Sequence, residues 1–153
     1  GSTGTVTSGP VGTGAVTVSN GAALDMAGYS LANALTLSGT GVSNSGAVYN
    51  SSSTAVTWSG ATTLAADATV KSEAGGALTW SGTINGAHAL TVDTDGSSAD
   101  AAFTLSGVLG SSTSLTGLAI NSGSANTTLS AAATVNGHVS ITSADIGLNA
   151  VFR

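Results

Sequence analysis

The sequence repeats one six-residue phrase six times. The copies are AVTVSN (15–20), ALTLSG (34–39), AVTWSG (55–60), ALTWSG (77–82), AFTLSG (102–107) and a weaker NTTLSA (126–131). They begin 19, 21, 22, 25 and 24 residues apart. A strand-sized unit that recurs at such an interval is typical of a solenoid, in which successive coils stack on one another. The repeat therefore favours a scaffold over a catalytic globule.

Each copy alternates between larger apolar residues and small or polar ones. This period of two is typical of a β-strand with one buried face. The third position of every copy is threonine, which predicts one outward row of threonines along the solenoid. The row consists of Thr17, Thr36, Thr57, Thr79, Thr104 and Thr128.

The two tryptophans occupy the same inward position of successive copies. We expect Trp58 and Trp80 to stack one above the other inside the coil, flanked by Leu37 and Leu105. The alternative is an exposed aromatic strip that binds sugar rings.

Further apolar positions lie between the copies, so that each repeat holds three apolar spots and hence three strands. We therefore expect an all-β fold, with residues 1–153 forming a single right-handed parallel β-helix (β-solenoid) of about seven rungs, three strands per rung. The uneven spacing of the copies argues against the left-handed form built on hexapeptides. Bends would absorb the differences in rung length.

Charge and composition exclude several classes of function. Lys71 and Arg153 are the only Lys and Arg residues, and the net charge is −5. Binding to nucleic acid or to an anionic membrane needs clustered cations, so neither is expected as a partner. The chain has no cysteine and no apolar run of the ~20 residues that span a bilayer, so we expect no disulfide and no membrane insertion.

Candidate chemistry is confined to one acidic loop. Asp93, Asp95 and Asp100 could offer oxygen ligands to calcium, although the full pattern of a helix-loop-helix calcium site is absent. The alternative is a polar bend in which Asp begins a turn before Gly. No nucleophile elbow is present, and a polysaccharide-cleaving groove would need more basic residues than the chain has. We expect no enzyme and no cofactor other than calcium at this loop.

The ends of the sequence show no capping element. The repeat is already under way by Val6, and the last residues are Val151, Phe152 and Arg153. Solenoids need polar caps to stay soluble, because an uncapped rung exposes unpaired strand edges. We expect either a slice of a longer solenoid or a subunit that stacks end to end on identical subunits.

The recurring phrase, with the stretches TTLAADATV (62–70) and GTINGAHALTV (82–92), resembles the repeats of large secreted bacterial surface proteins. These are the filamentous-haemagglutinin-like exoproteins and the autotransporter passengers, and the resemblance covers residues 15–141. It implies a right-handed β-helix located outside the cell or on the bacterial surface, where it serves adhesion, matrix building or cell-to-cell contact. Its partners would be neighbouring repeats and host or cell-surface glycans or proteins.

Three functions remain open at this stage. The leading hypothesis is a structural or adhesive fibre segment that presents regular side-chain rows for weak, multivalent contact. The second is an ice-binding solenoid, because a flat threonine row at steps of roughly 4.8 Å can order water. Ice-binding faces generally carry two threonines per rung, whereas here the flanking outward residues are Ala and Ser. The third is a self-stacking filament subunit.

Overall fold

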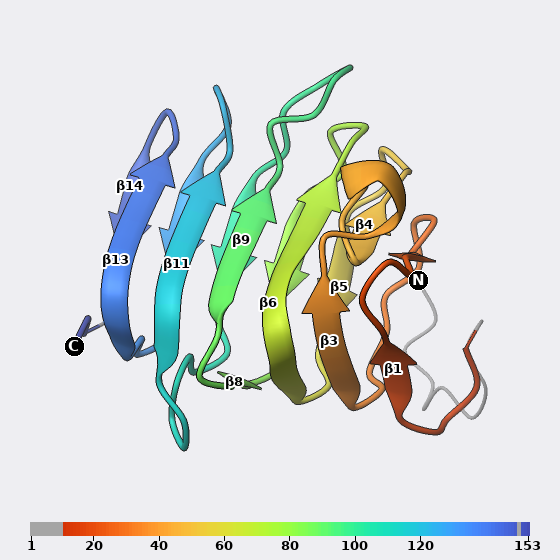
Figure 1. The fold of residues 1–153 in the computed structure, drawn as a ribbon. Helices are drawn as coiled ribbons and strands as arrows, with labels where there is room; N and C mark the ends of the chain where they lie inside the picture. Colours follow the sequence, from red (N-terminus) through yellow and green to blue (C-terminus); the bar gives the residue numbers. More distant parts are fainter. Residues whose placement is uncertain (1–10, 150) are drawn as a thin grey trace.

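The computed structural model describes residues 11–149 and 151–153, which form a parallel β-solenoid of about six turns (Figure 1). The expected all-β fold is confirmed, with one turn fewer than the sequence suggested. In Figure 1 the strands of the larger sheet run upward in front, and those of the smaller sheet run down behind. Each later turn lies farther to the left, so the coil is right-handed.

Two parallel sheets contain all the strands. The larger sheet consists of β1 (Val16–Val18), β2 (Leu24–Asp25), β3 (Leu35–Gly39), β4 (Val48–Asn50), β6 (Thr62–Ser72), β8 (Ile84–Asn85), β9 (Ala89–Asp93), β11 (Leu115–Asn121) and β13 (Val135–Thr142). The smaller sheet consists of β5 (Val56–Trp58), β7 (Leu78–Trp80), β10 (Phe103–Leu105), β12 (Thr127–Leu129) and β14 (Ile146–Leu148). The only helix among the described residues is the short 3-10 helix η1 (Val42–Asn44). No helix in this part of the chain is long and apolar enough to cross a membrane.

The larger sheet bends into two faces, so each turn has three faces, as the three apolar spots per repeat predicted. Parallel pairing aligns one inward residue per turn into a column on each face. The first column is Val16, Leu35, Thr62, Ile84, Leu109, Ala133 and Phe152. The second is Leu24, Val48, Val70, Val92, Ile120 and Ile141. The third is Leu31, Trp58, Trp80, Leu105, Leu129 and Leu148.

These columns fill the narrow interior and form one continuous hydrophobic core. Buried polar side chains line the corner between the second and third faces, where they close the connecting loops. Asn50 donates to the carbonyls of Ser52 and Thr54, Ser72 to that of Gly76, and Thr94 to that of Ala101. Each loop base therefore satisfies its own buried polar groups, whatever the length of the loop.

The six copies of the phrase do not form the single row that the sequence predicted. The first two copies form β1 and β3 on the first face, whereas the last four form β5, β7, β10 and β12 on the third face. The cause is the second turn, which contains η1 and is longer than the first. Val16 and its partner Leu35 are 19 residues apart, whereas Leu35 and its partner Thr62 are 27 residues apart. The extra residues move the third copy onto a different face.

Candidate functional site

A flat, uncharged surface covers the outside of the smaller sheet. Four threonines stand there in register, one per turn: Thr57 pairs with Thr79, Thr79 with Thr104, and Thr104 with Thr128. A second column lies two residues further along each strand. We call the two columns the hydroxyl face, which comprises Thr57, Thr79, Thr104, Thr128, Ser59, Ser81, Ser106 and Ser130.

The alternation of the strands determines how this face is built. The threonines are half-buried because they pack against their neighbours above and below, whereas the serines are exposed. The amides of Ser81, Ser106 and Ser130 each donate to a carbonyl of the preceding turn, which keeps the serine column in step with the strands. The segments 55–60, 77–82, 102–107 and 126–131 contain no Asp, Glu, Lys, Arg or His. The hydroxyl face can therefore bind only through neutral hydrogen bonds and methyl contacts.

The other two predicted threonines lie elsewhere. Thr17 pairs with Thr36 on the first face, and their row continues to Thr63 and then to Asn85. The structure thus places four of the six threonines together and separates two. It also shows that the serine column is as regular as the threonine column, a regularity already present in the fifth position of the phrase.

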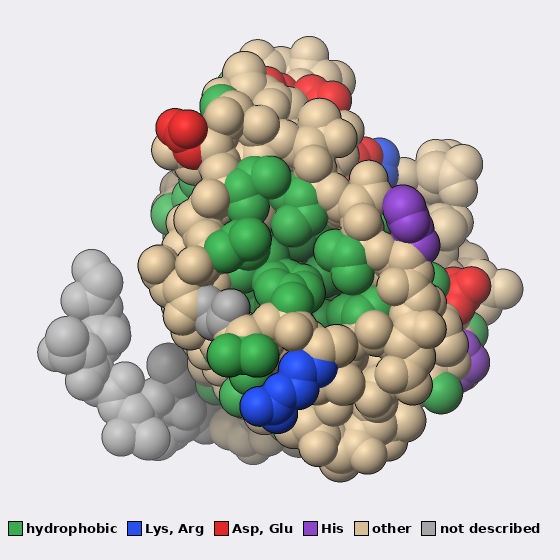
Figure 2. All heavy atoms as spheres, turned by 90° about the vertical axis from the view of Figure 1, so that its left-hand side faces the viewer, with side chains coloured by type: hydrophobic (Ala, Val, Ile, Leu, Met, Phe, Trp, Pro, Cys, Tyr) green, Lys and Arg blue, Asp and Glu red, His purple; other side chains and the backbone are tan. Residues whose placement is uncertain are grey.

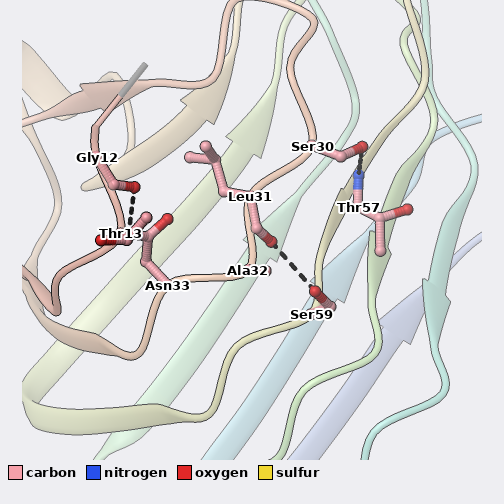
Figure 3. A pocket seen from close by; sticks show the side chains of 8 residues that line it. All are labelled: Gly12, Thr13, Ser30, Leu31, Ala32, Asn33, Thr57 and Ser59. Atoms are coloured by element: carbon pink, nitrogen blue, oxygen red, sulfur yellow. Dashed lines mark hydrogen bonds between the residues drawn. The ribbon is translucent and has the colours of Figure 1, made fainter. Parts of the chain in front are cut away.

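A hollow of about 390 Å³ lies at the first-turn end of the hydroxyl face (Figure 3). Its lining is Gly12, Thr13, Ser30, Leu31, Ala32, Asn33, Thr57 and Ser59. The Ser30 hydroxyl accepts a hydrogen bond from the Thr57 amide at 2.9 Å. The Asn33 side chain donates to the carbonyls of Gly12 and Gly14, at 3.1 and 2.6 Å. None of the lining residues is titratable, so the hollow extends the neutral character of the hydroxyl face.

The two tryptophans stack inside the coil as expected. Their ring centroids are 5.6 Å apart and their planes differ by 13°. Both side chains are buried, so the alternative of an exposed strip that binds sugars is wrong. The column neighbours are Leu31 and Leu105; Leu37, expected beside Trp58, lies on the first face.

The three loop aspartates do not assemble into a calcium site. Asp93 pairs with Lys71 at 3.1 Å, and Asp95 accepts a hydrogen bond from the Asn121 side chain at 3.0 Å. Within residues 11–149 and 151–153, no three His, Cys, Asp or Glu side chains are placed to hold a metal ion together. The arrangement corresponds to the alternative of a polar bend.

Asp100 in the same loop is held by the loop of the following turn. Its carboxylate accepts hydrogen bonds from the Ser124 hydroxyl at 2.6 Å and from the Ser124 amide at 2.7 Å. These bonds, and a weaker one with Asp95, hold the pKa of Asp100 below its ordinary value. The Asp100 carboxylate thus joins two neighbouring loops.

The fold defines the class of this protein as a parallel β-solenoid. No protein-family model, curated protein or solved structure matches the chain.

Proposed function

We propose that this chain is a structural and adhesive repeat segment of a secreted bacterial surface protein or extracellular fibre. The observation that carries the proposal is the in-register hydroxyl face, which repeats the same neutral contact on four successive turns. Such a face offers many weak, equivalent contacts, whose affinity comes from repetition. The partners would be cell-surface glycans or proteins, and the role is not catalytic.

The rigidity of the scaffold supports this role. Backbone hydrogen bonds run from turn to turn along the solenoid, and every face has an inward column of side chains. Because each turn pairs with its neighbours, the spacing between equivalent side chains is fixed at roughly 4.8 Å. A rigid row loses little entropy when several of its members bind one surface together.

Bead adhesion tests the proposal. Beads coated densely with the chain should adhere to glycan-coated or cell surfaces, and beads coated sparsely should not, because only dense coating gives multivalency. The double variant Thr79→Lys/Thr104→Lys places two charges on the hydroxyl face and should abolish adhesion. The matched control, Thr69→Lys/Thr91→Lys, makes the same change on the second face, where these two threonines also pair. Equal adhesion of both variants would contradict the assigned role of the hydroxyl face.

Ice binding is the second candidate, and the same threonine register favours it. Four threonines and four serines form a flat grid with steps of roughly 4.8 Å along the solenoid and roughly 6.7 Å across it, twice the rise per residue. A lattice of water molecules could match such a grid. The chain would then produce thermal hysteresis in solution, and Thr79→Lys/Thr104→Lys would remove it. Absence of hysteresis in the unmodified chain would exclude this candidate.

A further inference from the structure

The last turn of the solenoid is uncovered and apolar. Its inward positions lie in the same columns as core residues of the preceding turn, yet they face solvent. Val139 is 36% exposed and Leu148 is 56% exposed, whereas their partners Leu118 and Leu129 are 2% and 0% exposed. Ile146 is 45% exposed and pairs with the buried Thr127.

Figure 2 shows this end of the molecule face on. Hydrophobic side chains gather at its centre, inside a rim of polar side chains and backbone. The outer edges of β13 and β14 also carry backbone groups that would pair with a further strand, because these two strands end their sheets. An apolar centre beside free strand edges marks a binding surface for another β-structure.

The interface between turns shows which β-structure fits. β11 and β12 present apolar columns and strand edges to β13 and β14, which are parallel strands of the next turn. β13 and β14 present the same combination outward, so the matching occupant is again a parallel turn with an apolar side chain on each face. The first turn of the chain has that pattern, with Val16, Leu24 and Leu31 as the first members of the three columns. Val16 and Leu24 are only partly buried.

We propose that the last turn binds the first turn of a second copy of this chain, head to tail. The contact continues the turn-to-turn interface across two molecules. Because it joins two different surfaces, it does not close on itself, and repeated addition gives an open filament. The inference deepens the proposed role as a fibre, since copies joined in this way would extend the hydroxyl face.

Sedimentation velocity over a range of concentrations tests the contact. The unmodified chain should form a series of species that grows beyond the dimer. Ile146→Lys/Leu148→Lys should remain monomeric, because it places two charges in the contact. Both side chains are largely exposed, so the fold should be retained, as circular dichroism would show. Thr69→Lys/Thr91→Lys, remote from both ends, should assemble like the unmodified chain.

A mixing experiment tests the direction of stacking. Leu24→Lys should block the first-turn end, with Leu24→Ser as the milder substitute if the lysine lowers the melting temperature. Each end variant alone should be monomeric. A mixture of the two should form heterodimers and nothing larger, because each partner keeps one intact end.

A monomer at every concentration, or a dimer that never grows, would overturn the head-to-tail contact. Neither result would touch the adhesive role, because the bead experiment can be run with the monomeric Ile146→Lys/Leu148→Lys variant. Loss of adhesion with stacking intact would instead reject the proposed function alone.

Discussion

Replacing Trp80 with Ala should lower the free energy of unfolding by about 4 kcal/mol, the cost typical of truncating a buried tryptophan. The ring is 1% exposed and stacks on Trp58, so its removal leaves a cavity in the middle of the core. The indole nitrogen also donates to the Thr62 hydroxyl at 3.1 Å, and the loss of this bond leaves a buried hydroxyl without that partner. Urea denaturation, followed by circular dichroism, measures the change.

Tyr29→Ala is the control for this substitution. Its side chain is 60% exposed, so its truncation should change the free energy of unfolding by less than about 0.5 kcal/mol. A cost for Trp80→Ala as small as that of the control would mean that the two tryptophans do not stack in the core.

Gly82→Ala should destabilise the solenoid by about 3 kcal/mol, near the upper end of what overpacking usually costs. Gly60, Gly82 and Gly107 end their copies of the phrase at one corner, where successive turns approach closely. A Cβ atom at Gly82 would collide with the carbonyl oxygen of Gly60, and one at Gly107 with that of Gly82. The constraint is space alone, because none of the three glycines has a left-handed backbone.

Gly14→Ala provides the matched control. A Cβ atom there meets nothing within 4 Å, and the backbone is not left-handed. Its effect should be neutral or slightly stabilising, because alanine restricts the unfolded chain. Thermal unfolding of the two variants measures the difference, and equal melting temperatures would contradict the close approach at this corner.

Much of the fold could be predicted from the sequence, because each strand carries its own signal. Alternation within the phrase indicated the strands, the interval between copies indicated stacked turns, and the extra apolar spots indicated three faces. The stacking of Trp58 and Trp80 followed because no insertion separates their turns unevenly. These features depend on spacing within one turn or between adjacent turns.

The assignment of the copies to faces could not be predicted, for a physical reason. Any strand with one buried face needs the same alternation, so the phrase marks a strand without marking its face. The interval of 21 residues from the second to the third copy resembled a full turn, whereas the turn from Leu35 to Thr62 takes 27 residues. The loop aspartates were equally ambiguous, because their partners Lys71, Asn121 and Ser124 come from neighbouring turns.

The central claim is that four threonines share one face while Thr17 and Thr36 lie on another. Cysteine pairs test it directly, since the chain has no cysteine of its own. Paired residues on adjacent strands lie roughly 4.8 Å apart, within the range of about 4.4–6.8 Å that a disulfide spans between Cα atoms. Thr36→Cys/Thr63→Cys should therefore cross-link on oxidation, and Thr36→Cys/Thr57→Cys should keep two free thiols. The reverse result would place all six copies of the phrase in one row and contradict the hydroxyl face described above.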